Sequence, residues 1–359
     1  MDLTVKKNAF VQLGLFLKQF SNAPYQKQQE VLFNEEFYDA FGALINRLDQ
    51  GNSWFTKDQL EHAFSAWSMA LKAENLEQWL AAYQLDNEPS KTVGLILAGN
   101  IPMVGFHDVV SVLISGNKAL IKLSSNDQEL IPFLLNYLAR IAPEFKNRFK
   151  ITKERLEAFD AVIATGSNNT ARYFEYYFGK YPNIIRKNRN SVAVLDGKER
   201  IEDLIALGED IFRYYGLGCR NVSKLFVPKD YDFKLFFEAM YAYKDLIFFE
   251  KYANNYDYNK AVFLMSNFKI LDNEFMTLKE DEGYASPIST VFYENYDDLE
   301  EISNKLKRDK EQIQCVVSNG LIANSLKFGT TQYPELWEYA DGVDTMKFLV
   351  SLSHKNYQI

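Results

Sequence analysis

The sequence has too few metal-binding side chains for a metal centre and too few cysteines for a disulfide-stabilised fold. It contains two cysteines and three histidines in 359 residues. None of them recurs at the short spacing that is typical of zinc ligands. Two cysteines cannot build a disulfide framework, which favours a reducing compartment. We therefore predict no metal and a cytoplasmic location.

Other absences narrow the class of protein further. No apolar run reaches the length of a membrane span, and the first residues lack the pattern of a signal peptide. The net charge of −8 gives no basic surface for nucleic acid or an anionic membrane. The chain also has no G-x-G-x-x-G motif and no phosphate-binding P-loop. A nucleotide site, if present, must be built from other turns.

The chain has ample apolar material for two domains. Hydrophobic residues make up 47% and charged residues 25% of it, as in a soluble globular protein. Leucine and aromatic residues recur at helical spacing through the first ninety residues, and the pattern ends at Asn87-Glu88-Pro89-Ser90. We interpret residues 1–90 as a helical region that packs on the next domain.

From Val93 onward, strand-like and helix-like segments alternate. The expected strands are 93–98, 119–123, 159–164 and 191–195, and the expected helices between them are 104–115, 129–141 and 170–178. Such alternation with short turns predicts an α/β fold with a doubly wound parallel sheet. We expect a nucleotide-binding domain at 91–213 and an α/β catalytic domain at 214–335. Residues 336–359 would serve oligomerisation or return to the nucleotide domain.

Three turns follow the first three strands, where ligands of parallel sheets bind. Asn100 could donate its amide to an oxygen that becomes negative, or it could be a simple turn residue. Lys122, beside Ser124 and Ser125, could bind ribose or phosphate, or merely extend from the sheet edge. Gly166-Ser167 could hold a pyrophosphate on helix amides, or only cap the helix.

One cysteine stands in a context that suits a nucleophile. Cys219 follows two glycines in Gly216-Leu217-Gly218, so the backbone can turn sharply and present the thiol. Arg220 follows at once, and a nearby cation favours the reactive thiolate. A buried, inert thiol is the alternative. Cys315 lies in an apolar run and reads as a small hydrophobic residue of a strand.

Five short motifs, taken in order, resemble the aldehyde dehydrogenase superfamily. They are Asn100-Ile101-Pro102, Gly116-Asn117, Lys122-Leu123-Ser124, Thr165-Gly166-Ser167 and Gly216-Leu217-Gly218-Cys219. The resemblance covers roughly residues 90–325. Within the superfamily, the helical start with Trp54-Phe55-Thr56 and the short length resemble the acyl-CoA reductase family of fatty-acid reductases.

The resemblance implies a role for each matching residue. Cys219 would accept the acyl group, and Asn100 with the Cys219 amide would form the oxyanion hole. Lys122 and Ser124 would hold the adenosine ribose of a nicotinamide cofactor. Gly166 and Ser167 would hold its pyrophosphate.

Two departures from the superfamily pattern bear on the reaction. Counting back from Ser191 places Arg186 where aldehyde dehydrogenases carry a general-base glutamate. Without a base to activate water, hydrolysis of a thioester would be slow, which favours the reductive direction. Ser125 stands where many NAD-preferring members carry an acidic residue. We therefore expect NADPH, with NADH left open because Asp127 is near in sequence.

The sequence thus predicts a cytoplasmic oxidoreductase that reduces an acyl-CoA or acyl-carrier thioester to an aldehyde, and the resemblance suggests long-chain, fatty aldehydes. The reaction would proceed through a thioester intermediate on Cys219. Two alternatives are an acyltransferase or thioesterase that uses the same cysteine, and a non-catalytic member of the superfamily. The resemblance also implies a homo-oligomer, with no nucleic acid partner and no membrane span.

Overall fold

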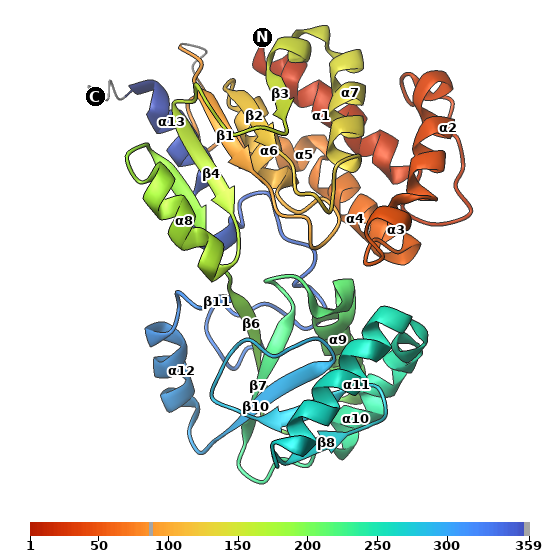
Figure 1. The fold of residues 1–359 in the computed structure, drawn as a ribbon, viewed down its shortest axis with the longest axis vertical. Coiled ribbons are helices and arrows are strands. Elements are labelled where there is room, and N and C mark those ends of the chain that lie inside the picture. The colour runs from red at the N-terminus through yellow and green to blue at the C-terminus, as the bar shows by residue number, and fades with distance from the viewer. Residues whose placement is uncertain (86–88, 355–359) are drawn as a thin grey trace. The chain divides into compact units, whose positions relative to one another are not determined.

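The computed structural model describes residues 1–85 and 89–354 (Figure 1). The chain forms two compact units, one made of residues 1–187 with the chain from 335 onward, the other of residues 188–334. We call them the first and second units and describe each by itself. The expected end of the helical region at Asn87-Glu88 lies outside the described residues, as does the segment 355–359.

The first unit contains a five-stranded parallel sheet in the order β3-β2-β1-β4-β5. Its strands are β1 (Thr92–Ile96), β2 (Lys118–Lys122), β3 (Phe149–Thr152), β4 (Ala161–Thr165) and β5 (Asn183–Arg186). The chain builds outward from β1 to β3, then crosses back to β4 beside β1. The predicted doubly wound parallel sheet is confirmed, while β3 and β5 were not predicted.

Helices cover both faces of this sheet. They are α6 (Phe106–Ile114), α7 (Leu130–Ile141), η1 (Pro143–Asn147) and α8 (Asn168–Phe178), together with α13 (Thr345–His354) at the end of the described chain. Helix α6 is buried on nearly all sides, because α1 and α13 both pack against it. Its almost continuous apolar sequence, Val109 to Ile114 with one serine, suits that position.

The N-terminal region is helical, as expected. It comprises α1 (Leu3–Lys18), α2 (Asn34–Ile45), α3 (Leu48–Gly51), α4 (Lys57–Ala70) and α5 (Ala73–Leu80). Its core is largely aromatic: the Phe16 ring lies 4.2 Å from Tyr137 of α7 and 5.2 Å from Phe41. Much of the aromatic content of the chain therefore serves packing between helices.

The second unit contains a six-stranded sheet in the order β11-β6-β7-β10-β9-β8. The strands are β6 (Asn190–Val194), β7 (Val222–Pro228), β8 (Ile270–Asp272), β9 (Thr277–Glu280), β10 (Thr290–Tyr296) and β11 (Ile313–Val317). All neighbours are parallel except β8 and β9. The helices are α9 (Ile201–Phe212), η2 (Arg213–Gly216), α10 (Lys234–Met240), η3 (Tyr241–Phe248), α11 (Glu250–Met265) and α12 (Leu299–Arg308).

Side chains of β7 alternate between two cores. Leu225 and Val227 face the larger core under α9 and α10. Phe226 faces the smaller core with Ile302 and Leu306 of α12. Lys224 shares the face of Phe226, since successive side chains of a strand point to opposite sides.

The division of the chain differs from the expected boundary at 213. The strand predicted at 191–195 is β6, and it pairs with β7 and β11 of the second sheet. The alternation of strand-like and helix-like segments predicts that a strand exists, but it does not predict which sheet the strand joins. After Pro334 the chain rejoins the first unit through η4 (Ala340–Gly342) and α13, which is one of the two roles considered for the C-terminal segment.

Candidate active site

The predicted site residues divide between the two units. Asn100, the Lys122–Ser125 turn and the Gly166–Ser167 turn belong to the first unit, and Cys219 belongs to the second. Because Ile96 of β1 pairs with Lys122 and with Ala164, the three turns leave the same edge of the first sheet. That edge lies at the reversal of strand order, where open α/β sheets bind ligands.

Two of these turns touch. A Cβ atom at Gly99 would lie 2.7 Å from both Cβ and Oγ of Ser124, so only glycine fits there. The carbonyl oxygen of Gly99 accepts a hydrogen bond of 3.1 Å from Nδ2 of buried Asn52. Asn100 and Ser125 are exposed beside this contact, whereas Lys122 and Ser124 are half-buried. The close approach fixes the spacing of the Asn100 and Ser124 turns.

The third turn leads into α8. Ser167 is its N-cap, and its Oγ accepts a 3.3 Å hydrogen bond from the Thr170 amide. A Cβ at Gly166 would lie 3.0 Å from both Phe174 and Thr170, so glycine lets the helix pack closely. The hydroxyl of Ser167 thus serves the helix, and any ligand at this turn would meet the first amides of α8.

Asp127 lies in the interior of the first unit. One carboxylate oxygen accepts a 3.4 Å hydrogen bond from the Leu130 amide at the start of α7, and the other oxygen has no partner among the described residues. Burial raises the pKa of this carboxyl to about 6. Asp127, rather than the serines before it, therefore serves the α7 N-terminus.

Arg186, expected from the resemblance at the position of a general base, is buried and fully engaged in polar contacts. Its Nη2 lies 2.6 Å from an Asp108 carboxylate oxygen and donates to Thr345 Oγ1 at 3.0 Å. Its Nη1 donates to the Ala340 carbonyl at 2.8 Å. These contacts join β5, α6 and the returning C-terminal segment. Nearby His107 is half-buried, and desolvation of its ring lowers its pKa and favours the neutral form.

In the second unit, an unusual backbone turn precedes Cys219. Tyr214, Tyr215 and Gly216 have φ angles of 53°, 57° and 77°, a region that glycine adopts easily and tyrosine rarely. Tyr215 is buried and its ring lies 4.7 Å from that of Phe249. Packing therefore holds a conformation that the backbone alone would avoid. Of the two predicted glycines, Gly216 takes part in this turn.

Asn221 closes the same loop from within. Its Nδ2 donates to the carbonyls of Arg213 at 2.7 Å and Asp210 at 3.1 Å. Its Oδ1 accepts from the Gly218 amide at 2.8 Å. The side chain is 3% exposed, so few waters could replace these bonds. No sequence motif marked Asn221, and its position two residues after the candidate nucleophile is the one signal that could have found it.

Asp210 anchors the neighbouring chain. Its carboxylate accepts hydrogen bonds from the amides of Gly329 and Thr331, at 2.7 and 2.9 Å. Burial raises its pKa to about 6. Arg220 Nε in turn donates to the Thr331 carbonyl. The guanidinium of Arg220 is thus anchored on this loop, and its influence on the thiol stays a prediction.

The two cysteines occupy different environments. Cys219 is exposed, whereas Cys315 in β11 is buried, with 7% of its surface exposed. Ser191 links their backbones, because its Oγ donates to the Cys219 carbonyl at 3.0 Å and accepts from the Cys315 amide at 3.1 Å. The Cys219 backbone is therefore tied to the sheet, although the residue itself is exposed.

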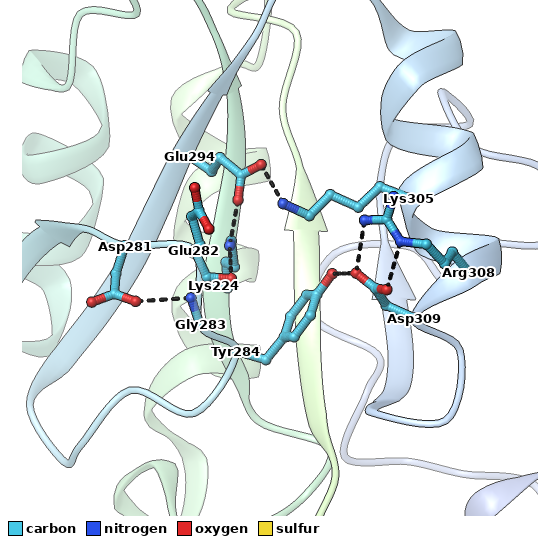
Figure 2. Close-up of polar contacts among 9 residues, drawn as sticks. All are labelled: Lys224, Asp281, Glu282, Gly283, Tyr284, Glu294, Lys305, Arg308 and Asp309. Carbon is cyan, nitrogen blue, oxygen red and sulfur yellow. Dashed lines mark hydrogen bonds and ion pairs between the residues drawn. The ribbon is translucent and has the colours of Figure 1, made fainter.

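A buried lysine lies five residues further along the chain. Lys224 is 0% exposed, and its Nζ donates to the Glu282 carbonyl at 2.8 Å and to Glu294 at 2.6 Å. Figure 2 shows the Glu294 carboxylate between Lys224 and Lys305, whose Nζ lies 2.5 Å from the other oxygen. Burial lowers the pKa of Lys224. The neighbouring Ser223 donates to the Tyr284 carbonyl, so two successive residues of β7 hold the 282–284 loop.

Within residues 1–85 and 89–354, the structure shows neither a candidate metal-binding cluster nor a helix that could span a membrane. These residues contain no cluster of three or more histidine, cysteine or acidic side chains that could hold a metal. No helix among them is long and apolar enough to cross a membrane.

Comparison with known proteins assigns the chain first to a fold. Aldehyde dehydrogenase 21 from Physcomitrella patens superposes with a TM-score of 0.62, at 13% identity, over 98% of this chain and 85% of its own. An indole-3-acetaldehyde dehydrogenase of P. syringae, in complex with NAD+, gives a TM-score of 0.60 at 14% identity, over 90% and 73%. The protein has the aldehyde dehydrogenase fold.

The family follows from sequence. The acyl-CoA reductase (LuxC) family model matches residues 12–241, and the chain belongs to this family. The long-chain acyl-protein thioester reductase 2 of Photobacterium leiognathi is 22% identical over 203 residues. That match covers 51% of this chain and 42% of the relative, so the chain matches less than half of the relative's length. The expected family is confirmed.

Proposed function

We propose that the protein reduces an acyl thioester to an aldehyde through a covalent thioester on Cys219, with NADPH as the reductant. The observation that carries the proposal is the exposed Cys219 side chain on a turn held by Asn221 and Ser191, in a chain of the acyl-CoA reductase family. A rigid backbone that presents one accessible thiol suits a nucleophile.

In the first step, the Cys219 thiolate attacks the thioester carbonyl. A carbon–sulfur bond forms to Cys219, the bond to the donor sulfur breaks, and the donor leaves as a thiol after taking up a proton. The Asn100 amide and the Cys219 backbone N–H would stabilise the oxyanion, as the family resemblance implies. CoA and an acyl carrier protein both carry acyl groups as thioesters, so either would serve as the acyl donor.

In the second step, the acyl carbon on Cys219 accepts a hydride, the chemistry that a bound nicotinamide supplies. The resulting thiohemiacetal collapses to the aldehyde and regenerates the thiolate. No carboxylate base stands at the position of Arg186, whose guanidinium is instead paired with Asp108. Water would therefore be activated poorly, and reduction would be favoured over hydrolysis of the thioester.

The turns of the first unit fit a dinucleotide. Lys122, Ser124 and Ser125 would hold the adenosine ribose, and Gly166 with Ser167 and the first amides of α8 the pyrophosphate. The close contact of Gly99 with Ser124 and the start of α8 at the strand-order reversal support this assignment.

The absence of an acidic residue at Ser125 favours NADPH, because no carboxylate there would repel a 2′-phosphate. Asp127 is buried and accepts a hydrogen bond from α7, which supports the same preference. NADH stays open. A homo-oligomer and a cytoplasmic location remain predictions.

The test follows NADPH consumption and aldehyde release with acyl-CoAs of increasing length. We expect activity in the wild type and in Cys315→Ala, and none in Cys219→Ala. Acylation of Cys219 without nicotinamide oxidation would favour the acyltransferase or thioesterase alternative, or a donor other than CoA. A protein that is neither acylated nor active would be a non-catalytic member of the superfamily.

A further inference from the structure

One side chain of the N-terminal helical region reaches the turn that carries Asn100. Asn52, which is 8% exposed, directly follows α3, and its Nδ2 donates a 3.1 Å hydrogen bond to the carbonyl oxygen of Gly99. That carbonyl and the backbone N–H of Asn100 belong to the same peptide group, which is planar. The hydrogen bond from Asn52 therefore acts on the plane that sets the direction of the backbone into Asn100.

Asn52 is itself held at each of its polar groups. Its backbone N–H donates to the Leu48 carbonyl at 3.0 Å, and its own carbonyl accepts from the Phe55 amide at 2.8 Å. Its Oδ1 accepts from the Trp54 amide at 3.2 Å, which leaves Nδ2 as the atom that bonds to Gly99. Phe55, which is 1% exposed, anchors this turn in the core. The donor therefore has a fixed position and orientation.

The Gly99 peptide is confined by a second contact. The space that a Cβ at Gly99 would need is filled by Ser124 at 2.7 Å and by the Cβ of Asn126 at 3.3 Å. Further along the same turn, buried Met103 has a φ angle of 59°, a conformation that methionine rarely adopts. Such residues persist only where the surrounding structure holds them, and they cluster at functional sites. The turn that carries Asn100 is therefore held firmly in one conformation.

We propose that Asn52 is a positioning residue for the acylation step and acts by aiming the Asn100 side chain at the oxyanion. The inference rests on the proposed function, in which the Asn100 amide stabilises the oxygen of the thioester carbonyl. An oxyanion donor is effective because it is held in place before the charge develops, so a small displacement weakens it strongly. Without Asn52, the peptide before Asn100 would rotate more freely, and the amide would occupy the productive position less often.

The test measures the rate at which octanoyl-CoA acylates Cys219, followed by intact mass without nicotinamide. Asn52→Ala should lower the rate at saturating octanoyl-CoA roughly 5- to 20-fold, a part of the effect of losing an oxyanion donor. The half-saturating concentration should change by less than about 2-fold, because the oxyanion forms only after the substrate is bound. Asn34→Ala is the matched control, since Asn34 is a buried asparagine of the same region whose Nδ2 donates to the Gln28 carbonyl at 2.5 Å.

A second variant separates the bond to Gly99 from the bond to Trp54. Asn52→Asp keeps the size of the side chain and the acceptor for the Trp54 amide, and it replaces the donor with a carboxylate oxygen that faces the Gly99 carbonyl. At about pH 8, where the carboxylate is ionised, we expect this variant to be acylated at least as slowly as Asn52→Ala. It also carries the comparison if Asn52→Ala does not fold.

A double-mutant cycle distinguishes positioning from a general effect on the structure. Asn100→Ala alone should slow acylation roughly 100-fold. Adding Asn52→Ala should slow it further by less than about 2-fold, because a residue that acts through Asn100 has nothing left to position. A further loss as large as in the wild-type background would overturn the inference. So would an Asn52→Asp variant that reacts at the wild-type rate, or an equal loss in Asn34→Ala.

Failure of the proposed function would give a different result. A wild type that no acyl-CoA acylates would refute the proposed function itself. Acylation of Asn100→Ala at the wild-type rate would refute the oxyanion role of Asn100, whatever the effect of Asn52→Ala.

Discussion

The buried network around Lys224 allows a sharp prediction about stability. Glu294 pairs with Lys224 at 2.6 Å and with Lys305 at 2.5 Å (Figure 2). Glu294→Gln leaves the fully buried Lys224 without its carboxylate, and breaking a buried pair in this way costs about 3–5 kcal/mol. Because Gln can still accept one hydrogen bond from Lys224, we expect a loss of stability at the lower end of this range, about 3 kcal/mol.

The two lysine variants should destabilise the protein less than Glu294→Gln does. Lys224→Met removes the buried charge itself and leaves Glu294 paired with Lys305. The variant loses the hydrogen bond to the Glu282 carbonyl and the inner ion pair, so we expect its free energy of unfolding to fall by about 1–2 kcal/mol. Lys305→Met leaves the inner pair intact at a partly exposed position, and should cost about 0–1 kcal/mol. The predicted order of damage is therefore Glu294→Gln, then Lys224→Met, then Lys305→Met.

The pH dependence of Glu294→Gln has a definite sign. Burial lowers the Lys224 pKa in the folded protein, so the unfolded chain binds more protons between the folded and unfolded pKa values. Stability contributed at this site therefore rises with pH in that window. Loss of Glu294 should lower the Lys224 pKa further and move the window toward neutrality. The deficit of the variant should shrink as the pH rises through this window.

Scanning calorimetry of the full chain measures the three variants. Hydrogen exchange should locate the change in the 282–291 segment for Lys224→Met, and not for Lys305→Met, because only Lys224 bonds the Glu282 carbonyl. Equal effects of the two lysine variants on both stability and exchange would refute the reasoning. So would a Glu294→Gln deficit that grows as the pH rises.

Three further predictions follow from the two units. Cys219 should react with iodoacetamide at least ~10-fold faster than the buried Cys315, as followed by peptide mapping of the native protein; equal rates would contradict the assigned exposure. Asn221→Ala should lower the free energy of unfolding by about 2–4 kcal/mol and slow that alkylation, since four backbone groups lose the bond to its side chain. A denaturant titration that finds the variant as stable as the wild type would refute this role. Asp127→Asn should raise the free energy of unfolding by about 1–2 kcal/mol at pH 8 and by nothing near pH 4. The reason is that a carboxyl with a folded-state pKa of about 6 loses stability as the pH rises from its unfolded-state pKa of about 4 to about 6, and the loss is complete above that. The opposite trend in melting temperature would exclude it.

Sequence patterning predicted the central strands well, because they are buried on both faces. The runs at 93–98 and 159–164 fall on β1 and β4, and Ala119–Lys122 falls on β2. The edge strands β3 and β5 escaped prediction because they are four residues long and only partly apolar. Membership of a sheet depends on pairing between distant segments, so the strand at 191 was expected in the first sheet and lies in the second.

The turns at Asn100 and Gly166 were predictable because each follows a buried strand, while their roles in binding or catalysis stay predictions. The supporting residues were not predictable, because their roles arise from contacts distant in sequence. Lys224 is a lysine in an apolar strand, and only the fold brings it to Glu294, 70 residues on.

The central claim is that Cys219 carries the acyl group during reduction. Intact-mass analysis after mixing with an acyl-CoA, followed by peptide mapping, measures this directly. The account predicts a mass increase of one acyl group on Cys219, its loss on addition of NADPH, and release of the matching aldehyde. NADPH-dependent aldehyde formation by Cys219→Ala, or an acyl group on another residue that NADPH discharges, would contradict it.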